Sequence, residues 1–257
     1  MDPHAVESKK IWVPLENNPA VMNHLGRKLG ASTTLSFTDV YSLTEPSLLA
    51  MVPRPVHALL FLYPGTVLSA RDLAMELEDQ EQYESCGPDE PVLWFHQTIG
   101  HACGLIGLLH CLTNGEAAKH ILPGSDLHKL IEMATPLKPK ERAQLLYDSD
   151  ILEKAHKEAA RTGDSRAPTI DEPVLYGFTA FVKGKDGHLW ELEGQRKGPV
   201  DRGVLEEGED VLSEKALQLG PLRIINREKA SEQRFSCLAL VDTDKSSAGL
   251  INNEAWN

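Results

Sequence analysis

Cys103 is the residue whose surroundings most clearly predict chemistry in this chain of 257 residues. Gln97 lies six residues before it, Gly104 follows it, and an apolar run suited to a helix continues to about Thr113. A thiolate attacks carbonyl carbon, and a helix N-terminus favours that negative charge. The Gln97 amide can donate to a developing oxyanion, and Gly104 lets a substrate carbonyl approach the backbone. The pattern predicts a thiol nucleophile with an amide donor.

A structural role for Cys103 competes with the catalytic one. A lone cysteine inside an apolar helix is more often a small buried hydrophobic residue than a nucleophile. The upstream Gln97 and the position at the helix start favour the nucleophile, but this spacing alone leaves both interpretations open. Catalysis also needs a general base, usually a histidine held by a carboxylate or amide, because a free thiol has a pKa of about 8.5.

The composition is that of an acidic globular protein. Lys and Arg number 26 against 38 Asp and Glu, which gives a net charge of -12, and 41% of the residues are hydrophobic. A core sufficient for a compact domain is therefore available. Nucleic acid is a poor partner, because phosphate binding needs clustered Lys and Arg. A basic protein partner fits the charge, although solubility alone would also account for it.

The four cysteines include no C-x-x-C pair, which predicts neither a disulfide framework nor a structural zinc site. We expect no cofactor and no metal. Residues 1–20 lack the apolar segment of a secretory signal, and apolar stretches such as residues 58–63 are too short to cross a bilayer. We therefore expect a cytoplasmic monomer that binds no membrane, with the nucleus as a second location.

The elements that must position Cys103 follow an α+β order, with most helices in the first half of the chain and most strands in the second. Periodicity and capping residues predict helices at 19–29, 103–113, 126–134, 140–161 and 214–227, the last broken or bent at Gly220-Pro221. Strands are predicted at 35–41 and 58–63, an early pair, and at 178–182, 188–193 and 235–241. Residues 79–91 and 162–173 are typical of polar loops. These elements predict one domain over residues 8–243, built on a central antiparallel sheet, and a loose tail at 244–257.

Residues 97–110, which read Q-T-I-G-H-A-C-G-L-I-G-L-L-H, closely resemble the active-site segment of the ubiquitin C-terminal hydrolases. These are papain-like cysteine peptidases of family C12. The likeness covers about residues 10–241 and includes the opening at 12–19, the strands at 58–63 and 235–240, and the hairpin at 178–194. It implies a papain-like fold in the short form that lacks a C-terminal regulatory extension. The implied substrate is the ubiquitin C-terminal tail, joined to a small leaving group or to lysine.

The resemblance also implies roles for individual positions. Cys103 would be the nucleophile and Gln97 the oxyanion donor. The position of the family's general-base histidine is Gly177, and the position of its orienting aspartate is Glu193, one methylene longer. Residues 162–173 would form the loop that crosses over the active site and limits the size of the leaving group. Without its base, the site is expected to keep its binding surface and lose most of its turnover.

Three of the ten histidines are candidates to substitute for the base. His188, on the hairpin partner, is expected to be structural or exposed, His101 has unfavourable local geometry, and His96 adjoins Gln97. None is expected to replace the missing histidine. Three interpretations remain open: a ubiquitin hydrolase with impaired turnover, a ubiquitin-binding module without catalysis, and a scaffold that keeps only the fold. Gly177 itself fits either a natural binding relative or an engineered removal of the base.

Overall fold

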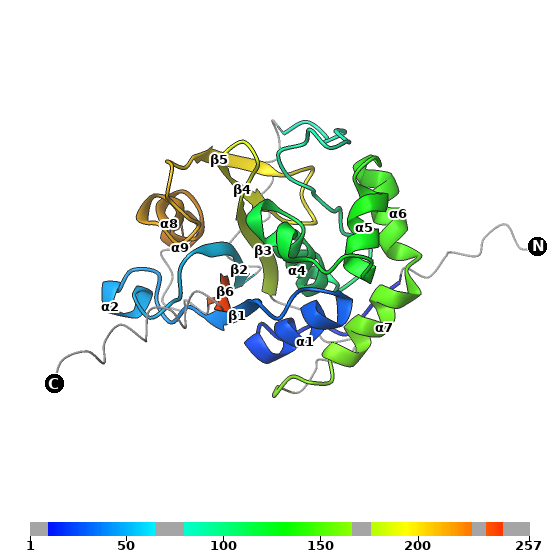
Figure 1. Ribbon diagram of the computed structural model, residues 1–257, viewed down its shortest axis with the longest axis horizontal. Helices are drawn as coiled ribbons and strands as arrows, with labels where there is room; N and C mark the ends of the chain where they lie inside the picture. The colour runs from blue at the N-terminus through cyan, green and yellow to red at the C-terminus, as the bar shows by residue number, and fades with distance from the viewer. Residues whose placement is uncertain (1–9, 65–79, 166–175, 228–234, 244–257) are drawn as a thin grey trace, which may run out of the picture.

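The computed structural model describes residues 10–64, 80–165, 176–227 and 235–243 (Figure 1). Its centre is a sheet with the strand order β1-β6-β2-β3-β4-β5, in which every neighbouring pair is antiparallel. The strands are β1 Leu35–Asp39, β2 Val56–Pro64, β3 Tyr176–Lys183, β4 His188–Leu192, β5 Val200–Val204 and β6 Ser236–Asp242. The predicted α+β class with a central antiparallel sheet is confirmed.

Short helices cover both faces of this sheet. They are α1 Pro19–Leu29, α2 Pro46–Leu49, α4 Cys103–Leu112, α5 Asp126–Ala134, α6 Pro139–Tyr147, α7 Asp150–Ala159, α8 Glu214–Leu219 and α9 Pro221–Arg227, with a 3-10 helix, η1, at Gly115–His120. Within the described ranges, none of them has both the length and the apolar character needed to cross a membrane.

The helix starts follow from local side-chain chemistry. Asn18 accepts a hydrogen bond from Ala20 N at 2.8 Å, and Pro19 occupies the first helical position of α1. Gly30 ends that helix at φ 115°, in the left-handed region that favours glycine. Ser125 caps α5 by accepting from His128 N at 3.2 Å. These predicted boundaries are confirmed.

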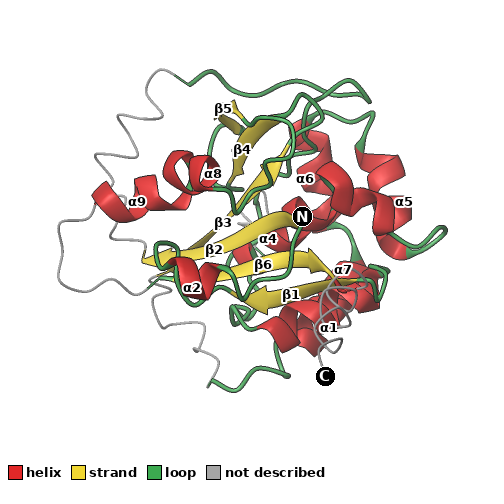
Figure 2. Cartoon of the chain, turned by 60° about the vertical axis from the view of Figure 1, so that its left-hand side comes forward, coloured by secondary structure: helices red, strands yellow, loops and turns green. Residues whose placement is uncertain are grey.

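The sheet separates two hydrophobic cores, as Figure 2 shows with α1 and α4 to α7 on one side and α2, α8 and α9 on the other. Leu60 and Leu238 belong to the core beneath α4, whereas Phe61 belongs to the opposite core. Helix α4 packs closely on the sheet, because a Cβ atom at Gly107 would lie 2.6 Å from Cδ1 of Leu60. The nucleophile candidate thus begins a helix that is fixed against the central strands.

Two features of the fold differ from prediction. The single helix predicted for residues 140–161 is wrong: α6 ends at Tyr147, and Ser149 starts α7 by accepting a hydrogen bond from Leu152 N. The early strands β1 and β2 do not pair with each other, because β6 lies between them. Pairing of that kind depends on contacts distant in the sequence, so a local pattern does not reveal it. The break in the last predicted helix, at Gly220 between α8 and α9, is confirmed.

Candidate active site

The fold brings the four predicted site positions to one end of the sheet. The backbone of Phe178, at the start of β3, lies close enough to the Cys103 thiol to favour its thiolate form. The loop before α4 is tied to the turn after β4, because Gln97 N donates to Gly194 O at 2.8 Å. The positions that these contacts gather are Cys103, Gln97, Gly177 and Glu193.

The Cys103 thiol lies at the first residue of α4, after an N-cap residue, Ala102, that offers no side-chain hydrogen bond. Burial raises the pKa of Cys103 to about 11, although the backbone of Gly104 and of Phe178 lowers it in part. The negative charge of Glu193 raises it further. At neutral pH this thiol is therefore protonated, and the helix N-terminus alone does not activate it.

Gly104 has a packing role that the sequence did not reveal. A Cβ atom at this position would lie 2.9 Å from Cβ of Leu15, so only glycine lets the opening segment pack against the start of α4. The same segment holds the preceding loop, because Trp12 N donates to Gly100 O at 2.9 Å and Gly100 N donates to Lys10 O at 2.8 Å. The start of the chain therefore fixes the loop that carries Gln97.

The Gln97 side chain is turned into its own loop. Its amide nitrogen, Nε2, donates to Ile99 O at 3.0 Å, so one of its two N–H groups is engaged before any substrate is present. The loop then turns sharply at His101, which has φ 59° and is the only non-glycine residue with positive φ in the described part of the chain. Such a conformation costs about 1–3 kcal/mol and persists where the surroundings enforce it. This turn at His101 directs the backbone into α4, which begins at Cys103.

Tyr63 lies in the space beside Gly177. The two residues face each other in the register of β2 and β3, and a Cβ atom at Gly177 would lie 3.1 Å from both Cζ and Oη of Tyr63. Burial, followed by the negative charge of Glu193, raises the pKa of Tyr63 well above its ordinary value. A neutral phenol, which donates a proton in a hydrogen bond, therefore adjoins the predicted base position.

Glu193 is held by a cation. Its Oε2 accepts a hydrogen bond from Arg196 Nε at 3.1 Å, and Arg196 also donates to Glu191 at 2.6 Å. Burial raises the pKa of Glu193, against the lowering effect of Arg196. Burial would also raise the pKa of Glu191, but Arg196, Arg202 and Arg223 lower it overall. The carboxylate in the position of the orienting aspartate thus belongs to a buried ion-pair network.

His188 is far from the predicted base position. Its Nδ1 lies 2.9 Å from Oδ2 of Asp201, and it starts β4 next to Gly184. Gly184 lies seven residues after Gly177 along β3 and the turn that follows it. At about 3.3 Å per residue in a strand, His188 is therefore roughly 20 Å from the predicted base position. The geometry therefore agrees with a structural His188 that is hydrogen-bonded to Asp201.

His110 is the histidine on α4 itself, and it serves the core. Its Nε2 accepts a hydrogen bond from Phe95 N at 3.0 Å, and burial lowers the pKa of His110 to about 3. This neutral imidazole fixes the chain just before Gln97. Among the groups of the described residues that act most strongly on the Cys103 thiol, none is an imidazole.

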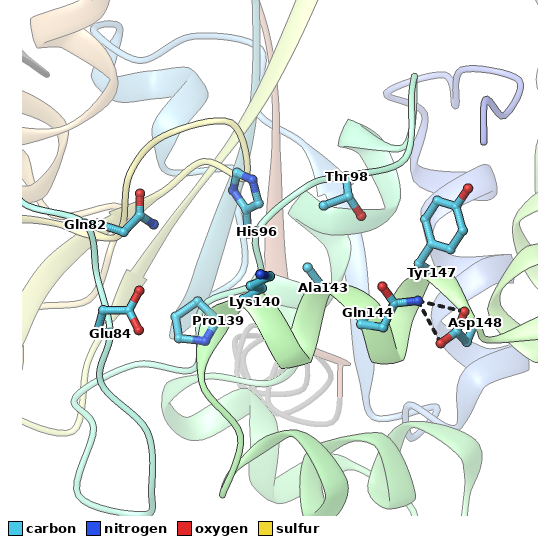
Figure 3. A pocket seen from close by; sticks show the side chains of 10 residues that line it. All are labelled: Gln82, Glu84, His96, Thr98, Pro139, Lys140, Ala143, Gln144, Tyr147 and Asp148. Carbon is cyan, nitrogen blue, oxygen red and sulfur yellow. Dashed lines mark hydrogen bonds between the residues drawn. The ribbon is translucent and has the colours of Figure 1, made fainter. Parts of the chain in front are cut away.

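A polar groove of about 940 Å³ lies beside the loop that carries Gln97. Figure 3 shows His96 and Thr98 on one side of it and Lys140 and Gln144 of α6 on another. His96 thus lines this groove, and its ring also contacts that of Trp94 in a tilted arrangement, with centroids 5.7 Å apart. The groove adjoins the oxyanion loop, but Cys103 is not among the residues that line it.

The predicted crossing loop, residues 162–173, is described only as far as Ser165. Its first part is anchored on the opening segment: Ser165 N donates to Glu16 Oε2 at 2.9 Å, and Asn18 Nδ2 donates to Asp164 at 3.2 Å. The rest of this loop and the predicted tail at 244–257 lie outside the described residues.

Two residues of the site escaped the sequence analysis. Tyr63 occurs in a run that reads as an ordinary buried strand, and only the register of β2 and β3 places it beside Gly177. Arg196 follows the hairpin in a polar stretch, where its spacing of three from Glu193 is a weak signal. Both contacts are set by the turn after β4 and by strand pairing.

Comparisons with known proteins show the family of this chain. The model of a family described as ubiquitin carboxyl-terminal hydrolase, family 1, matches residues 12–220. A ubiquitin carboxyl-terminal hydrolase of Aplysia californica is 38% identical over 203 residues, which are 77% of this chain and 88% of the relative. A probable ubiquitin carboxyl-terminal hydrolase of Dictyostelium discoideum is 33% identical over 241 residues, 94% of this chain and 92% of the relative.

A solved structure supports the predicted fold. The catalytic domain of Trichinella spiralis UCH37, bound to ubiquitin vinyl methyl ester, superposes with a TM-score of 0.69 at 21% identity. The match covers 90% of this chain and 95% of that domain. The papain-like arrangement of helices around an antiparallel sheet is therefore confirmed.

Proposed function

Because the chain belongs to the ubiquitin carboxyl-terminal hydrolase family, family 1, we propose that it binds the C-terminal tail of ubiquitin and hydrolyses bonds at its terminal glycine slowly. Cys103 is the nucleophile and Gln97 the donor to the oxyanion. The observation that carries the proposal is the pair of Gly177 and Tyr63, which occupies the predicted position of the imidazole, with Tyr63 close enough to Cys103 for the two to interact electrostatically.

The reaction needs a group that accepts the thiol proton. The Cys103 sulfur attacks the carbonyl carbon of the ubiquitin glycine, and its proton must pass to the leaving amine or to water. With a pKa of about 11, about one thiol in 10⁴ is ionised at pH 7. Oxyanion stabilisation and binding still give a residual rate of about 10³–10⁴ over water when a triad lacks a member. A low but thiol-dependent turnover follows.

The geometry around the other two positions also supports slow turnover. The bond to Ile99 O uses one of the two N–H groups of the Gln97 amide and turns that amide into its own loop, and Glu193 is engaged by Arg196. An oxyanion donor contributes about 2.7–4 kcal/mol only when it is aimed at the oxyanion in advance. The site therefore supports binding better than catalysis.

Ubiquitin as the partner is supported by the family and by the ubiquitin adduct that occupies the Trichinella spiralis structure. The net charge of -12 suits the basic tail of ubiquitin. The second candidate function is a ubiquitin-binding module without turnover. The neutral Cys103 and the engaged Glu193 are the observations that favour it.

Two measurements on the same protein distinguish these functions. Hydrolysis of a fluorogenic ubiquitin C-terminal amide is followed for the unmodified chain, for Cys103→Ser and for Cys86→Ser, which changes an exposed thiol. Ubiquitin binding is measured by isothermal titration calorimetry. Slow turnover that is lost only in Cys103→Ser supports the hydrolase. Micromolar binding without turnover supports the module, and the absence of both contradicts the proposal.

A further inference from the structure

Two histidines and an aspartate meet at the end of the sheet opposite to the candidate active site. His57 belongs to β2, His120 ends η1, and Asp242 ends β6. One ligand-type atom from each of the three lies within 4.8 Å of the others, and the two imidazole centroids are 5.9 Å apart. Since η1 follows the far end of α4, this cluster and Cys103 lie at opposite ends of that helix.

A β-bulge places His57 in the cluster. Val56 pairs with Val241 and Ala58 pairs with Leu240, so two steps along β2 correspond to one step along β6. His57 is the extra residue at this shift. A bulge re-aims a side chain and is over-represented next to functional sites. Here it lets β2 keep Val56 and Ala58 in the two cores while His57 joins His120.

The side chains of the cluster are of the types that bind divalent cations. Asp242, which is only 6% exposed, supplies carboxylate oxygens, and His57 and His120 supply imidazole nitrogens. Imidazole nitrogen and carboxylate oxygen are together a common ligand set for zinc and related divalent metals. Two neutral imidazoles and one carboxylate would carry a single negative charge, which a dication more than neutralises.

A hydrogen bond outside the cluster orients one of the rings. His120 Nδ1 lies 3.0 Å from the Thr34 hydroxyl, and the Thr34 backbone oxygen accepts from the Thr243 hydroxyl at 3.0 Å. Metal-binding histidines almost always use their second nitrogen in this way, which fixes the ring for the first. With Nδ1 engaged by Thr34, Nε2 of His120 is the atom left for a ligand bond.

From this geometry we propose that His57, His120 and Asp242 bind one divalent transition-metal ion, with zinc as the preferred metal. Zinc bonds of about 2.0–2.2 Å place tetrahedral ligands about 3.3–3.6 Å apart, so the three side chains need to close by about 1 Å at most. A water molecule or Glu116, which lies near both imidazoles, completes the tetrahedron. The ion would join β2, β6 and η1 as a structural site, in contrast to the metal-free chain expected from cysteine spacing.

The test uses tag-free protein with Cys86→Ser and Cys103→Ser, because both accessible thiols also bind zinc. After dialysis against chelator, the protein is titrated with zinc by calorimetry and with cobalt by visible absorption. We expect one ion per chain and the d–d bands of tetrahedral cobalt. His57→Gln and Asp242→Asn should weaken zinc binding by about 100-fold or more, and Thr34→Val by about 10–100-fold.

His24→Gln is the matched control, because His24 is exposed on α1 and lies outside the cluster. Its zinc affinity should equal that of the parent. Circular dichroism and thermal melting of the metal-free proteins show whether each variant folds. If a variant at a ligand position does not fold, the zinc affinity of Thr34→Val still tests the proposal, because Thr34 orients His120 without binding the metal. If all variants bind zinc with equal affinity, the zinc is adventitious. If the folded parent binds no zinc, the cluster is only a hydrogen-bonded group of histidine and carboxylate side chains. Either result overturns the proposal.

Discussion

Tyr63 and Gly177 face each other across β2 and β3, and the phenol of Tyr63 reaches to 3.1 Å from the point where a side chain at residue 177 would begin. A separation of this size is tighter than ordinary van der Waals contact. Any larger residue at 177 therefore requires the tyrosine ring to shift by a few tenths of an ångström. Tyr63 therefore occupies part of the space that a histidine at residue 177 would need.

Gly177→His should raise kcat/KM for a fluorogenic ubiquitin amide by about 10²–10⁴-fold, because it supplies the general base. Gly177→Asn is the control, since it adds a similar bulk without a basic nitrogen. Adding Tyr63→Phe to Gly177→His removes Oη, one of the two close atoms, and should increase the gain. If histidine and asparagine give the same rate, residue 177 is not the position of the base.

The reactivity of Cys103 should rise steeply in alkali. Its pKa of about 11 predicts that alkylation by iodoacetamide accelerates about tenfold per pH unit from pH 7 to about pH 10. The measurement is mass spectrometry of the Cys103 peptide in a Cys86→Ser background. The buried thiols Cys111 and Cys237 are internal controls that should stay unmodified. A rate that levels off below pH 9 would show an activated thiol and contradict the proposed slow turnover.

Acidification should destabilise the fold from about pH 6.5 downwards. Burial lowers the pKa of His110 to about 3 and that of His156 to about 4. The unfolded chain therefore takes up protons at a pH where the folded chain does not, so the free energy of unfolding falls as the pH falls. Each histidine contributes about 1.4 kcal/mol per pH unit over this window.

Urea unfolding at pH 7, 6 and 5 measures this dependence. His110→Gln keeps a side-chain acceptor for Phe95 N but cannot titrate, and should remove about half of the slope. A free energy of unfolding that is constant from pH 7 to pH 5 would mean that neither imidazole is held neutral.

The buried pair of Arg142 and Glu90 should be critical for stability near the candidate active site. Arg142 is fully buried and donates to Glu90 Oε1 at 3.1 Å and to Ala134 O at 2.8 Å, which joins α6 to the segment before Gln97. Arg142→Met leaves the Glu90 carboxylate buried and uncompensated, which should cost about 3–5 kcal/mol in urea unfolding.

Lys119→Met is the matched control for that substitution, because Lys119 pairs with Glu116 at an exposed site. Its expected cost is below about 1 kcal/mol. The double variant Glu90→Gln with Arg142→Met should recover part of the lost stability, since no unpaired charge remains. Equal costs for Arg142→Met and Lys119→Met would show that burial does not set the strength of the Arg142 pair.

The sequence alone predicted those helix boundaries that are set by interactions between neighbouring residues. Asn18, Pro19, Gly30 and Ser125 act through neighbouring backbone groups, so the bounds of α1 and α5 followed from residue types. The motif around Cys103 similarly placed the helix start. The break between α6 and α7 was missed because the helical pattern continues across Ser149, whose capping role competes with it.

The parts that escaped prediction depend on pairing between distant segments. Tyr63 reaches Gly177 through strand register, and Arg196 reaches Glu191 and Glu193 through the turn after β4. His57 meets His120 and Asp242 only because of a bulge and an inserted strand. Apart from the weak (i,i+3) spacing of Glu193 and Arg196, these contacts leave no period or spacing in the chain, so they required the three-dimensional structure.

The insertion of β6 between β1 and β2 also constrains how the protein is made. Ser236, where β6 starts, comes 172 residues after Pro64, where β2 ends. At about 5–20 residues per second, a ribosome needs roughly 10–35 s to cover that distance. Throughout this interval, β1 and β2 each expose an unpaired edge in the nascent chain, which is a template for aggregation. We therefore expect these two edges to need protection until β6 has emerged.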